Sequence, residues 1–379
     1  MTTTTTTTPT DRDRTGERIF NFSAGPATLP EEVLRQAQSD IFNIAGTGIG
    51  ILEHSHRGSL FTRIIEEAEA ACRRVAGISD DYHVLFLQGG ATLQFAMVPM
   101  NFLPAGKVAD YLDTGSWTSK AIKEARLLGS LNIAFDGGKR GYDHIPAAHE
   151  LSLSRDAAYV YFCSNNTIVG TEYSEPPATD APLVCDASSD ILSRPIDVAR
   201  YALVFAGAQK NLGPAGCTLV IVSKDFLRGA RDQLPSMLDY RQHAAQGSRL
   251  NTAPVFGIYF MGEVFKWIER QGGLEVMARR NREKARIIYD VIDSALGVGT
   301  TFYRGMARSD SRSMMNLTFR TPSDDLDEKF VTQARQLGME GLKGHRSVGG
   351  MRASIYNAFP RAGCEALAAL LKDFAKKNS

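Results

Sequence analysis

The chain has 379 residues, long enough for one large α/β domain and a smaller second domain. Apolar residues make up 43% of it and charged residues 22%, a balance typical of soluble globular proteins and unlike that of disordered or membrane chains. The 43 basic and 42 acidic residues leave a net charge of +1, so the sequence shows no general electrostatic attraction to nucleic acid or to an anionic membrane surface.

The five cysteines are scattered, with no C-x-x-C pair and no spacing typical of metal ligands, so we expect reduced thiols and no metal site. No apolar run approaches the roughly 20 residues that a membrane span requires, and the N-terminus has no hydrophobic signal region. These features favour a cytoplasmic protein. A threonine tract at 2–8 is followed by alternating Asp and Arg, which predicts a disordered tail over residues 1–17.

From residue 18 onward, short apolar runs alternate with segments of helical periodicity, which predicts a mainly parallel sheet covered by helices. Helical patterns occupy 31–44, 60–75, a stretch ending at 102, and 119–128. Seven short apolar runs are expected to form the strands of the sheet, at 84–87, 108–112, 131–135, 158–162, 183–185, 203–206 and 218–222.

Two long helical patterns, 255–270 and 274–296, separate this region from a C-terminal part in which the elements follow another order. There the patterns read strand, helix, strand, helix, at 314–319, 325–337, 352–356 and 365–376. We therefore predict an α/β fold in two domains. Residues 18–270 would hold the N-terminal segment and a large domain with a mainly parallel seven-stranded sheet, and residues 271–379 a linking helix and a small α+β domain.

The segment Gln88-Gly89-Gly90-Ala91-Thr92 directly follows a predicted strand and precedes a helical pattern. Small residues at the start of a helix let backbone N–H groups approach a phosphate, and the helix N-terminus favours its negative charge. Considered alone, the segment is as readily a tight turn, because glycine often marks turns.

Lys210 stands just beyond a predicted buried strand, inside the run of small residues FAGAQKNLGP at 205–214. Loss of hydration can lower the pKa of a lysine there and make its amine a nucleophile able to form a Schiff base. Without other evidence, a solvated lysine at a strand end is the commoner case.

Asp186 ends another predicted strand. The stretch between it and Lys210 is long enough for one connection and one further strand. A carboxylate in this place can keep a pyridine nitrogen protonated, so that the ring withdraws electrons from a substrate carbanion. An ordinary helix cap together with Ser188 and Ser189 explains the residue equally well.

Two clusters of basic side chains are candidate anion-binding groups: His56-Arg57, and His345-Arg346 followed by Arg352. Arginine binds carboxylate and phosphate through two parallel hydrogen bonds and histidine adds a donor, so the clusters suit a substrate with an anion at each end. Each cluster considered alone is more commonly a set of solvated surface residues.

These segments together resemble the phosphoserine aminotransferase family, within the class V aminotransferases, from about residue 19 to residue 374. In chain order the motifs that carry the resemblance are NFSAGP (21–26), SHRG (55–58), QGGAT (88–92), SRPID (193–197), GAQKNLGPAG (207–216) and KGHRSVGGMRAS (343–354). The last two are the longest and the most specific.

The resemblance implies the fold-type I architecture of pyridoxal-phosphate enzymes and pyridoxal 5'-phosphate as the cofactor. Lys210 would bind the cofactor covalently, Asp186 would pair with its pyridine nitrogen, and Trp117, otherwise expected in the core, would stack on its ring. The further cofactor contacts that it implies are Ala91, Thr92, Thr167 and Gln209, and, across a subunit interface, Asn251 and Thr252. We therefore expect a homodimer with shared active sites.

For the substrates, the resemblance implies Arg352 on the α-carboxylate. It places His345 and Arg346, with His56 and Arg57 of the partner subunit, around the distal phosphate or carboxylate. The implied reaction is reversible ping-pong transfer of an amino group from L-glutamate to 3-phosphohydroxypyruvate, giving O-phospho-L-serine and 2-oxoglutarate in L-serine synthesis. The sequence leaves open whether the enzyme also forms 4-phosphohydroxy-L-threonine for pyridoxine synthesis.

Three other functions compete with this one. Another class V activity is possible in principle, but a cysteine desulfurase needs an activated cysteine on a mobile loop, and none of the five cysteines lies in an obvious one. The glycines of 46–50 suggest a nicotinamide-dependent dehydrogenase, yet they follow a helical pattern and lack the full G-x-G-x-x-G fingerprint. A non-catalytic binding protein with this fold is the third alternative.

Overall fold

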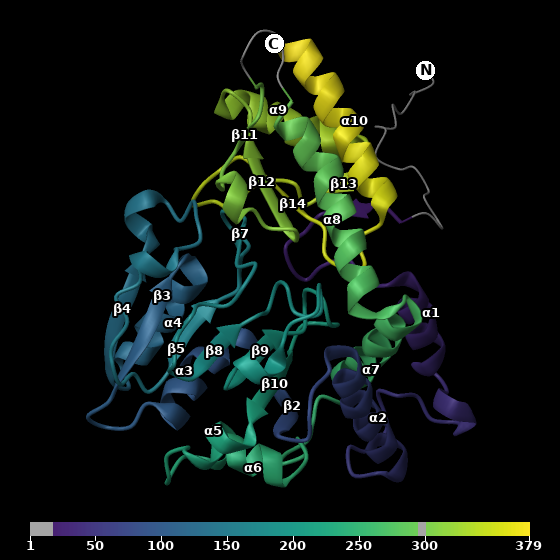
Figure 1. Ribbon diagram of the computed structural model, residues 1–379. Helices are drawn as coiled ribbons and strands as arrows, with labels where there is room; N and C mark the ends of the chain where they lie inside the picture. Colours follow the sequence, from purple (N-terminus) through teal and green to yellow (C-terminus); the bar gives the residue numbers. More distant parts are fainter. Residues whose placement is uncertain (1–17, 295–300) are drawn as a thin grey trace, which may run out of the picture.

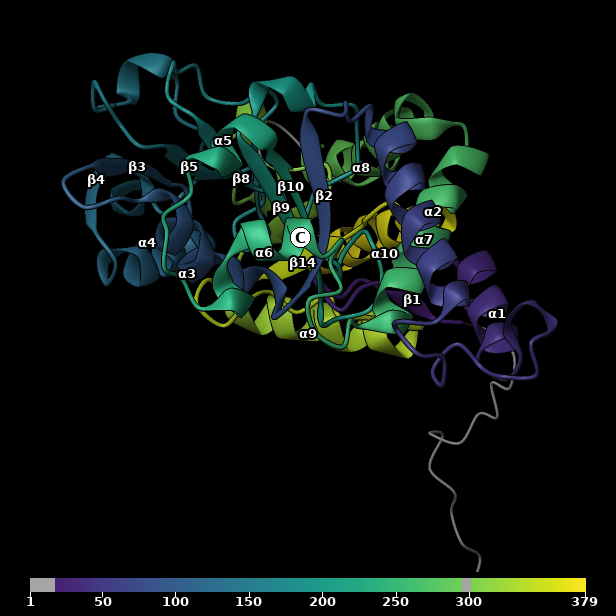
Figure 2. The ribbon, with the colours of Figure 1, turned by 90° about the horizontal axis from the view of Figure 1, so that it is seen from below.

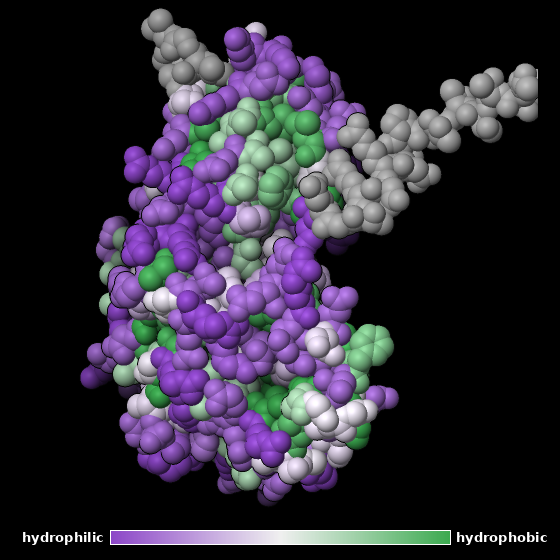
Figure 3. Space-filling view, turned by 90° about the vertical axis from the view of Figure 1, so that its right-hand side faces the viewer, coloured by the Kyte–Doolittle hydropathy of each residue, from purple (hydrophilic) through white to green (hydrophobic). Residues whose placement is uncertain are grey.

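The computed structural model describes residues 18–294 and 301–379, so the predicted tail at 1–17 lies outside the described residues. The chain forms a large part around a seven-stranded sheet and a smaller part above it, and helix α8 (Gly273–Ile292) runs between the two (Figure 1). Figure 3 shows that the surface is hollowed between the two parts when the molecule is seen from the side.

The large sheet has the strand order β2-β10-β9-β8-β5-β3-β4. Every strand is parallel to its neighbours except β10, which is antiparallel to both, because residues 208–216 turn directly back from β9 without a crossover helix. The mainly parallel seven-stranded sheet predicted from the sequence is confirmed. Its strands are β2 (Tyr82–Gln88), β3 (Val108–Asp113), β4 (Ser130–Asp136), β5 (Val160–Cys163), β8 (Leu183–Asp186), β9 (Leu203–Gly207) and β10 (Cys217–Ser223).

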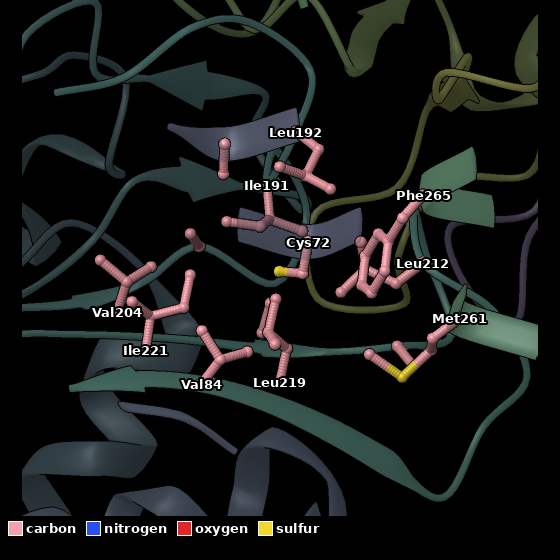
Figure 4. Packing of buried hydrophobic residues seen from close by; sticks show 14 of the residues in the cluster. Cys72, Val84, Ile191, Leu192, Val204, Leu212, Leu219, Ile221, Met261 and Phe265 are labelled. Atoms are coloured by element: carbon pink, nitrogen blue, oxygen red, sulfur yellow. The ribbon is translucent and has the colours of Figure 1, made fainter. Parts of the chain in front are cut away.

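Side chains of the central strands alternate between two apolar clusters, one on each face of the sheet. In β10, Leu219 and Ile221 pack with α2 (Ser59–Ala76) and α7 (Val255–Arg270), whereas Val220 and Val222 pack with α3 (Gly90–Phe102) and α4 (Ser116–Arg126). Figure 2 shows the two pairs of helices on opposite sides of the sheet, and Figure 4 shows Phe265 of α7 among strand side chains. Burial on both faces explains why these strands read as apolar runs.

Three further helices complete the large part. They are α1 (Glu31–Asp40), α5 (Lys224–Arg228) and α6 (Tyr240–Ala245). Although the sequence predicts a helix over 31–44, α1 ends at Asp40, whose carbonyl accepts a hydrogen bond from the Ile51 N–H (2.8 Å). Gly50 permits this close return, because a Cβ at that position would lie 1.8 Å from the Ile41 carbonyl oxygen. The glycine-rich run therefore closes a loop after a helix, as its sequence context predicted.

The small part contains an antiparallel sheet of β11 (Arg304–Gly305), β12 (Asn316–Arg320) and β14 (Met351–Ser354), packed on α8, α9 (Asp324–Gln336) and α10 (Arg361–Asn378). The N-terminal strand β1 (Phe20–Asn21) pairs with β13 (Met339–Glu340), and Phe22 is buried in the same apolar cluster. The N-terminal strand thus packs with the C-terminal part, although the sequence grouped it with the large domain. We propose that the small domain comprises residues 271–379 together with this strand.

The helices of residues 18–294 and 301–379 include none that is long and apolar enough to cross a membrane.

A buried group of charges lies where the two parts meet. Arg194 Nη1 is 2.6 Å from Glu172 Oε1 and 3.1 Å from Asp190 Oδ2, and Arg194 Nη2 donates to the Tyr173 carbonyl (2.6 Å). Glu172 also accepts a hydrogen bond from the N–H of Met314, just before β12 (2.7 Å). Burial raises the pKa of Glu172 to about 7, against the opposing effect of the Arg194 charge.

We expect Arg194→Met to lower the free energy of unfolding by about 3–5 kcal/mol at pH 8, because it leaves two buried carboxylates without their cation. The folded pKa of Glu172 lies above its unfolded value of 4.5, so protonation favours the folded chain and this contribution is lost as the pH rises through about 7. Without Arg194 the pKa of Glu172 rises further. The loss of unfolding free energy in the variant should therefore be smaller at pH 6 than at pH 8. Urea unfolding at both pH values measures this.

Arg200→Met is the matched control, because Arg200 forms a solvent-exposed ion pair with Glu175 (2.6 Å). Such a pair contributes only about 0–1 kcal/mol, with no comparable dependence on pH. Equal losses in the two variants would contradict a structural role for the buried cluster.

Candidate active site

The candidate site lies at the edge of the large sheet where the parallel strands end, the usual place for ligands in open α/β sheets. Strand β2 leads there into Gly89, β8 ends at Asp186, and β9 leads into the turn that carries Lys210. Parallel strands far apart in sequence thus bring the glycine turn, the carboxylate and the amine to one edge.

A chain of contacts joins Lys210 to the small part. Lys210 Nζ lies 5.5 Å from the centroid of the Trp117 ring, and Trp117, in the first turn of α4, donates from Nε1 to Thr167 Oγ1 (3.0 Å). The carbonyl of Thr167 accepts a hydrogen bond from Nη1 of Arg352, on β14 (3.1 Å). The amine, the indole ring and the guanidinium are therefore connected to one another through Thr167 where the two parts meet.

The surroundings of Lys210 keep its amine poorly hydrated. Burial lowers the pKa of Lys210, and the Asp186 carboxylate opposes that shift. The backbone of Gly25 packs against the lysine stem, since a Cβ there would lie 3.2 Å from Lys210 Cγ. Gln209, the residue before it, accepts a hydrogen bond from Ala27 N–H through its carbonyl (2.9 Å). The unprotonated, nucleophilic form of Lys210 is therefore more accessible than that of an exposed lysine.

Asp186 is 3% exposed, and hydrogen bonds hold its carboxylate in one orientation. Its Oδ1 accepts from the Ser188 N–H (3.0 Å) and from Ser188 Oγ (2.5 Å), and Ser188 Oγ accepts from Gly207 N–H (3.0 Å). Burial raises the pKa of Asp186, whereas the Ser188 bonds and the Lys210 charge lower it. Residues 187–189 form a turn and not a helix, so the helix-cap interpretation is wrong.

The glycine pair after β2 forms the start of α3. Gly89 has φ +92° and a Cβ there would lie 2.5 Å from the Leu93 side chain, so this position requires glycine. Ala91 and Thr92 lie in the first helical turn. Since the residue preceding the helix has no side chain to cap it, the first N–H groups can bind an anion.

The C-terminal basic cluster lies close enough to Arg352 and Lys120 for their charges to affect His345. His345 and Arg346 line a cavity of about 600 Å³ together with Lys343 and Arg320. Burial lowers the pKa of His345, and the charges of Arg352, Arg346 and Lys120 lower it further. Within the part of the chain that the structure describes, Arg352 Nε is buried without a hydrogen-bond partner, so it can donate to a ligand.

The remaining predicted residues lie elsewhere in the single chain. His56 and Thr252 line a separate groove of about 560 Å³ beside Pro214 and Phe256, and Lys210 is not among its lining residues. Arg57 is exposed next to it. Asn251 donates from Nδ2 to Oε1 of Gln88, just before the glycine turn (3.0 Å).

Sequence reasoning missed two residues. Lys120 Nζ lies 4.2 Å from the centroid of the Trp117 ring, close enough for a cation–π interaction. Its position three residues after Trp117, on one face of α4, is the signal that could have revealed it. Ser188 was considered only as part of a helix cap, because its bond to Gly207 depends on the pairing of β8 with β9.

Comparison with known proteins gives consistent results. The family model "Aminotransferase class-V" matches residues 19–367. A phosphoserine aminotransferase of Desulfotalea psychrophila is 50% identical over 362 residues, which cover 96% of this chain and 99% of that protein. The solved phosphoserine aminotransferase from Bacillus circulans subsp. alkalophilus has a TM-score of 0.92 at 48% identity, covering 96% of this chain and 99% of that one. The PLP-bound enzyme from Trichomonas vaginalis has a TM-score of 0.88 at 39% identity, covering 94% and 100%.

In the ligand-free protein we expect the Lys210 amine to react with cyanate at pH 7.5 several-fold faster than the exposed Lys377, because burial lowers the pKa of Lys210. Asp186→Asn removes the charge that raises this pKa, so it should move the midpoint of the rate–pH profile lower still. Peptide mass spectrometry measures both rates. The same midpoint for Lys210 and Lys377 would contradict the assignment.

Proposed function

This chain belongs to the phosphoserine aminotransferase family of the class-V aminotransferases, and we propose that it transfers an amino group reversibly between L-glutamate and 3-phosphohydroxypyruvate. The products would be O-phospho-L-serine and 2-oxoglutarate, in L-serine synthesis. One observation of this chain's own structure carries the proposal: the Lys210 amine lies near the Trp117 ring, and Thr167 bonds both to that ring and to Arg352.

The residues at the sheet edge fit pyridoxal 5'-phosphate. Asp186 offers a buried carboxylate to a ring nitrogen, Trp117 offers a ring face, and the first turn of α3 offers N–H donors to a phosphate. When bound, this cofactor supplies an electron-withdrawing ring that stabilises negative charge at the substrate α-carbon. Ala91, Thr92, Thr167 and Gln209 would complete the contacts from the same chain.

Each side chain then has a defined task. Lys210 Nζ would hold the cofactor covalently, and its amine is the group that would carry a proton to and from the substrate α-carbon. Asp186 holds a proton at the ring nitrogen. Arg352 donates Nε and its terminal nitrogens to the α-carboxylate, since paired hydrogen bonds to a carboxylate fix its orientation. Trp117 covers the ring and excludes water.

The second anion of the substrate would be bound by His345 and Arg346. Their positive surroundings include Arg352 and Lys120, which also contribute to lowering the pKa of His345. A phosphate or a second carboxylate is the group that such a cluster stabilises best. This arrangement favours phosphoserine and glutamate over a substrate with one anion, such as alanine.

We propose that the active form is a homodimer with shared sites, in which His56, Arg57, Asn251 and Thr252 serve the neighbouring subunit. Large apolar side chains are exposed in the segment that leads to His56: Phe42 is 80% exposed, Leu52 59% and Ile49 44%. The lower part of the surface in Figure 3, where α1 and α2 lie, carries hydrophobic groups. Exposed apolar side chains clustered in this way are typical of an interface.

The cysteines argue against a desulfurase. All five are free and buried, and burial raises the pKa of Cys72, Cys217 and Cys364 to about 12 each. Burial also raises the pKa values of Cys163 and Cys185 well above the ordinary value of a thiol. A thiol nucleophile requires the opposite shift. Free buried thiols also suit a reducing compartment, and we propose that the protein works in the cytoplasm.

The first test is an assay of glutamate with 3-phosphohydroxypyruvate, using the wild-type protein and Lys210→Ala. We expect phosphoserine from the wild type only, and loss of the visible absorbance of the lysine-bound cofactor in the variant, because no other residue replaces the amine. Lys120→Ala is the control that keeps this absorbance. A cofactor band without phosphoserine would move the substrate assignment to another class V reaction, and no band at all would overturn the cofactor assignment.

The shared site predicts complementation between two inactive variants. Mixing Lys210→Ala with the double variant His56→Ala/Arg57→Ala should restore about a quarter of wild-type activity, because half of the dimers are mixed and each holds one intact site. Activity after subunit exchange by dilution and reconcentration measures this. Failure to recover, with exchange verified by native mass spectrometry, would place all site residues in one chain.

A further inference from the structure

A buried lysine outside the site has an unusual set of partners. Lys284 lies in the middle of α8 and is only 4% exposed. Its Nζ donates to the carbonyls of Tyr356 (2.7 Å), Ile355 (2.9 Å) and Phe359 (3.2 Å), and lies 3.4 Å from that of Asn357. One ammonium group thus gathers four carbonyls of a five-residue segment, 355–359.

The charge of Lys284 is balanced by these peptide dipoles and not by a carboxylate. Burial lowers the pKa of Lys284 to about 8, which still leaves most of the amine protonated at neutral pH, and its hydrogen bonds within the described residues go to backbone carbonyls. Burying an ammonium without an anion is costly, and an apolar side chain of similar length would fill the same space. A lysine with this free-energy cost of burial therefore points to a role in which the conformation of segment 355–359 has to be fixed.

Segment 355–359 directly follows β14, the strand that carries Arg352. Its Tyr356 hydroxyl donates to the Ala24 carbonyl (2.7 Å), next to Gly25, whose backbone packs against the Lys210 stem. The segment is therefore connected to Arg352 through β14 and to the surroundings of Lys210 through Ala24 and Gly25.

The same segment reaches the turn that carries Lys210. Asn357 N–H donates to Oδ1 of Asn211, the residue after Lys210 (3.0 Å), and Asn357 Nδ2 donates to the Leu192 carbonyl (2.8 Å). Asn281, one helical turn before Lys284, donates to Asn357 Oδ1 (2.8 Å) and to the Ser193 carbonyl (3.1 Å). These amides link α8, segment 355–359 and the Lys210 turn in one buried network.

We infer that Lys284 is a positioning residue for the reaction of the proposed function: by holding the carbonyls of segment 355–359 on α8, it fixes Arg352 relative to Lys210. Arg352 lies on β14 of the small sheet and Lys210 in the turn that follows β9 of the large sheet, so neither apolar core alone sets the distance between them. A displacement of about 1 Å between a substrate clamp and a reacting group can cost on the order of 100-fold in rate. The ammonium of Lys284 holds segment 355–359 on α8, and Asn357 of that segment is hydrogen-bonded to Asn211 beside Lys210, so the two contacts together limit that displacement.

The test compares Lys284→Met holoenzyme with the wild type by two measurements. Calorimetric titration with maleate, a dicarboxylate that carries no amino group, should show a Kd raised about tenfold, because Arg352 is no longer held in place. The kcat/KM for glutamate should fall by about 100-fold. Lys372→Met, on the exposed face of α10, is the matched control and should change neither quantity.

Two further variants keep the test decisive where Lys284→Met folds poorly. Asn281→Ala removes only one amide of the network and should weaken maleate binding in the same direction by a smaller factor. Lys284→Arg keeps a cation and several donors, and should recover part of the affinity. Wild-type Kd and kcat/KM in Lys284→Met, or a lowered melting temperature with unchanged maleate affinity, would overturn the inference. A wild type that binds maleate but forms no phosphoserine would remove the proposed function, and the Kd comparison would still decide the role of Lys284.

Discussion

The structure depends on one constraint: the amine of Lys210 must be shielded from water and still be reachable from the space between the two parts. The direct turn from β9 to β10 satisfies it by holding the lysine at the sheet edge, and this turn is also why β10 runs against its neighbours. Gly25 packs against the lysine stem without a side chain of its own. Asp186 stands near enough to oppose the effect of burial on the lysine pKa, and Ser188 keeps that carboxylate oriented.

Two other cations, the half-buried Arg194 and the buried Lys284, show how differently this chain balances charge. Arg194 lies between two carboxylates, so removing it leaves anions that must take up protons. Lys284 faces carbonyl dipoles, so removing it leaves no net charge but frees a segment of backbone. Arg194 therefore contributes mainly to stability, whereas Lys284 mainly fixes the backbone conformation of segment 355–359. Both lie where the small part meets the large one.

The sequence predicted the elements whose signal is local. The seven strands were found because burial on both faces makes each one a continuous apolar run, and the edge of the candidate site was predicted because Asp186 ends such a run and Lys210 follows another. Pairing over long distances was missed: β1 and β13 have two residues each and carry no pattern of their own. The end of α1 was missed because it depends on the return of Gly50 to Ile41. Lys120 was missed because its role follows from the orientation of the Trp117 ring.

The site residues divide by the same rule. Those on the large sheet follow from strand order, since parallel strands place their carboxyl ends together. Arg352 comes from another sheet, and its place depends on the bond to the Thr167 carbonyl on one side and on segment 355–359 on the other. Each such link joins one side chain to a backbone atom of a residue far away in the sequence, and a backbone atom leaves no mark on residue identity. A motif can thus name the arginine that we propose binds a carboxylate, but the contacts that fix its distance from Lys210 form only when the two parts are packed on α8.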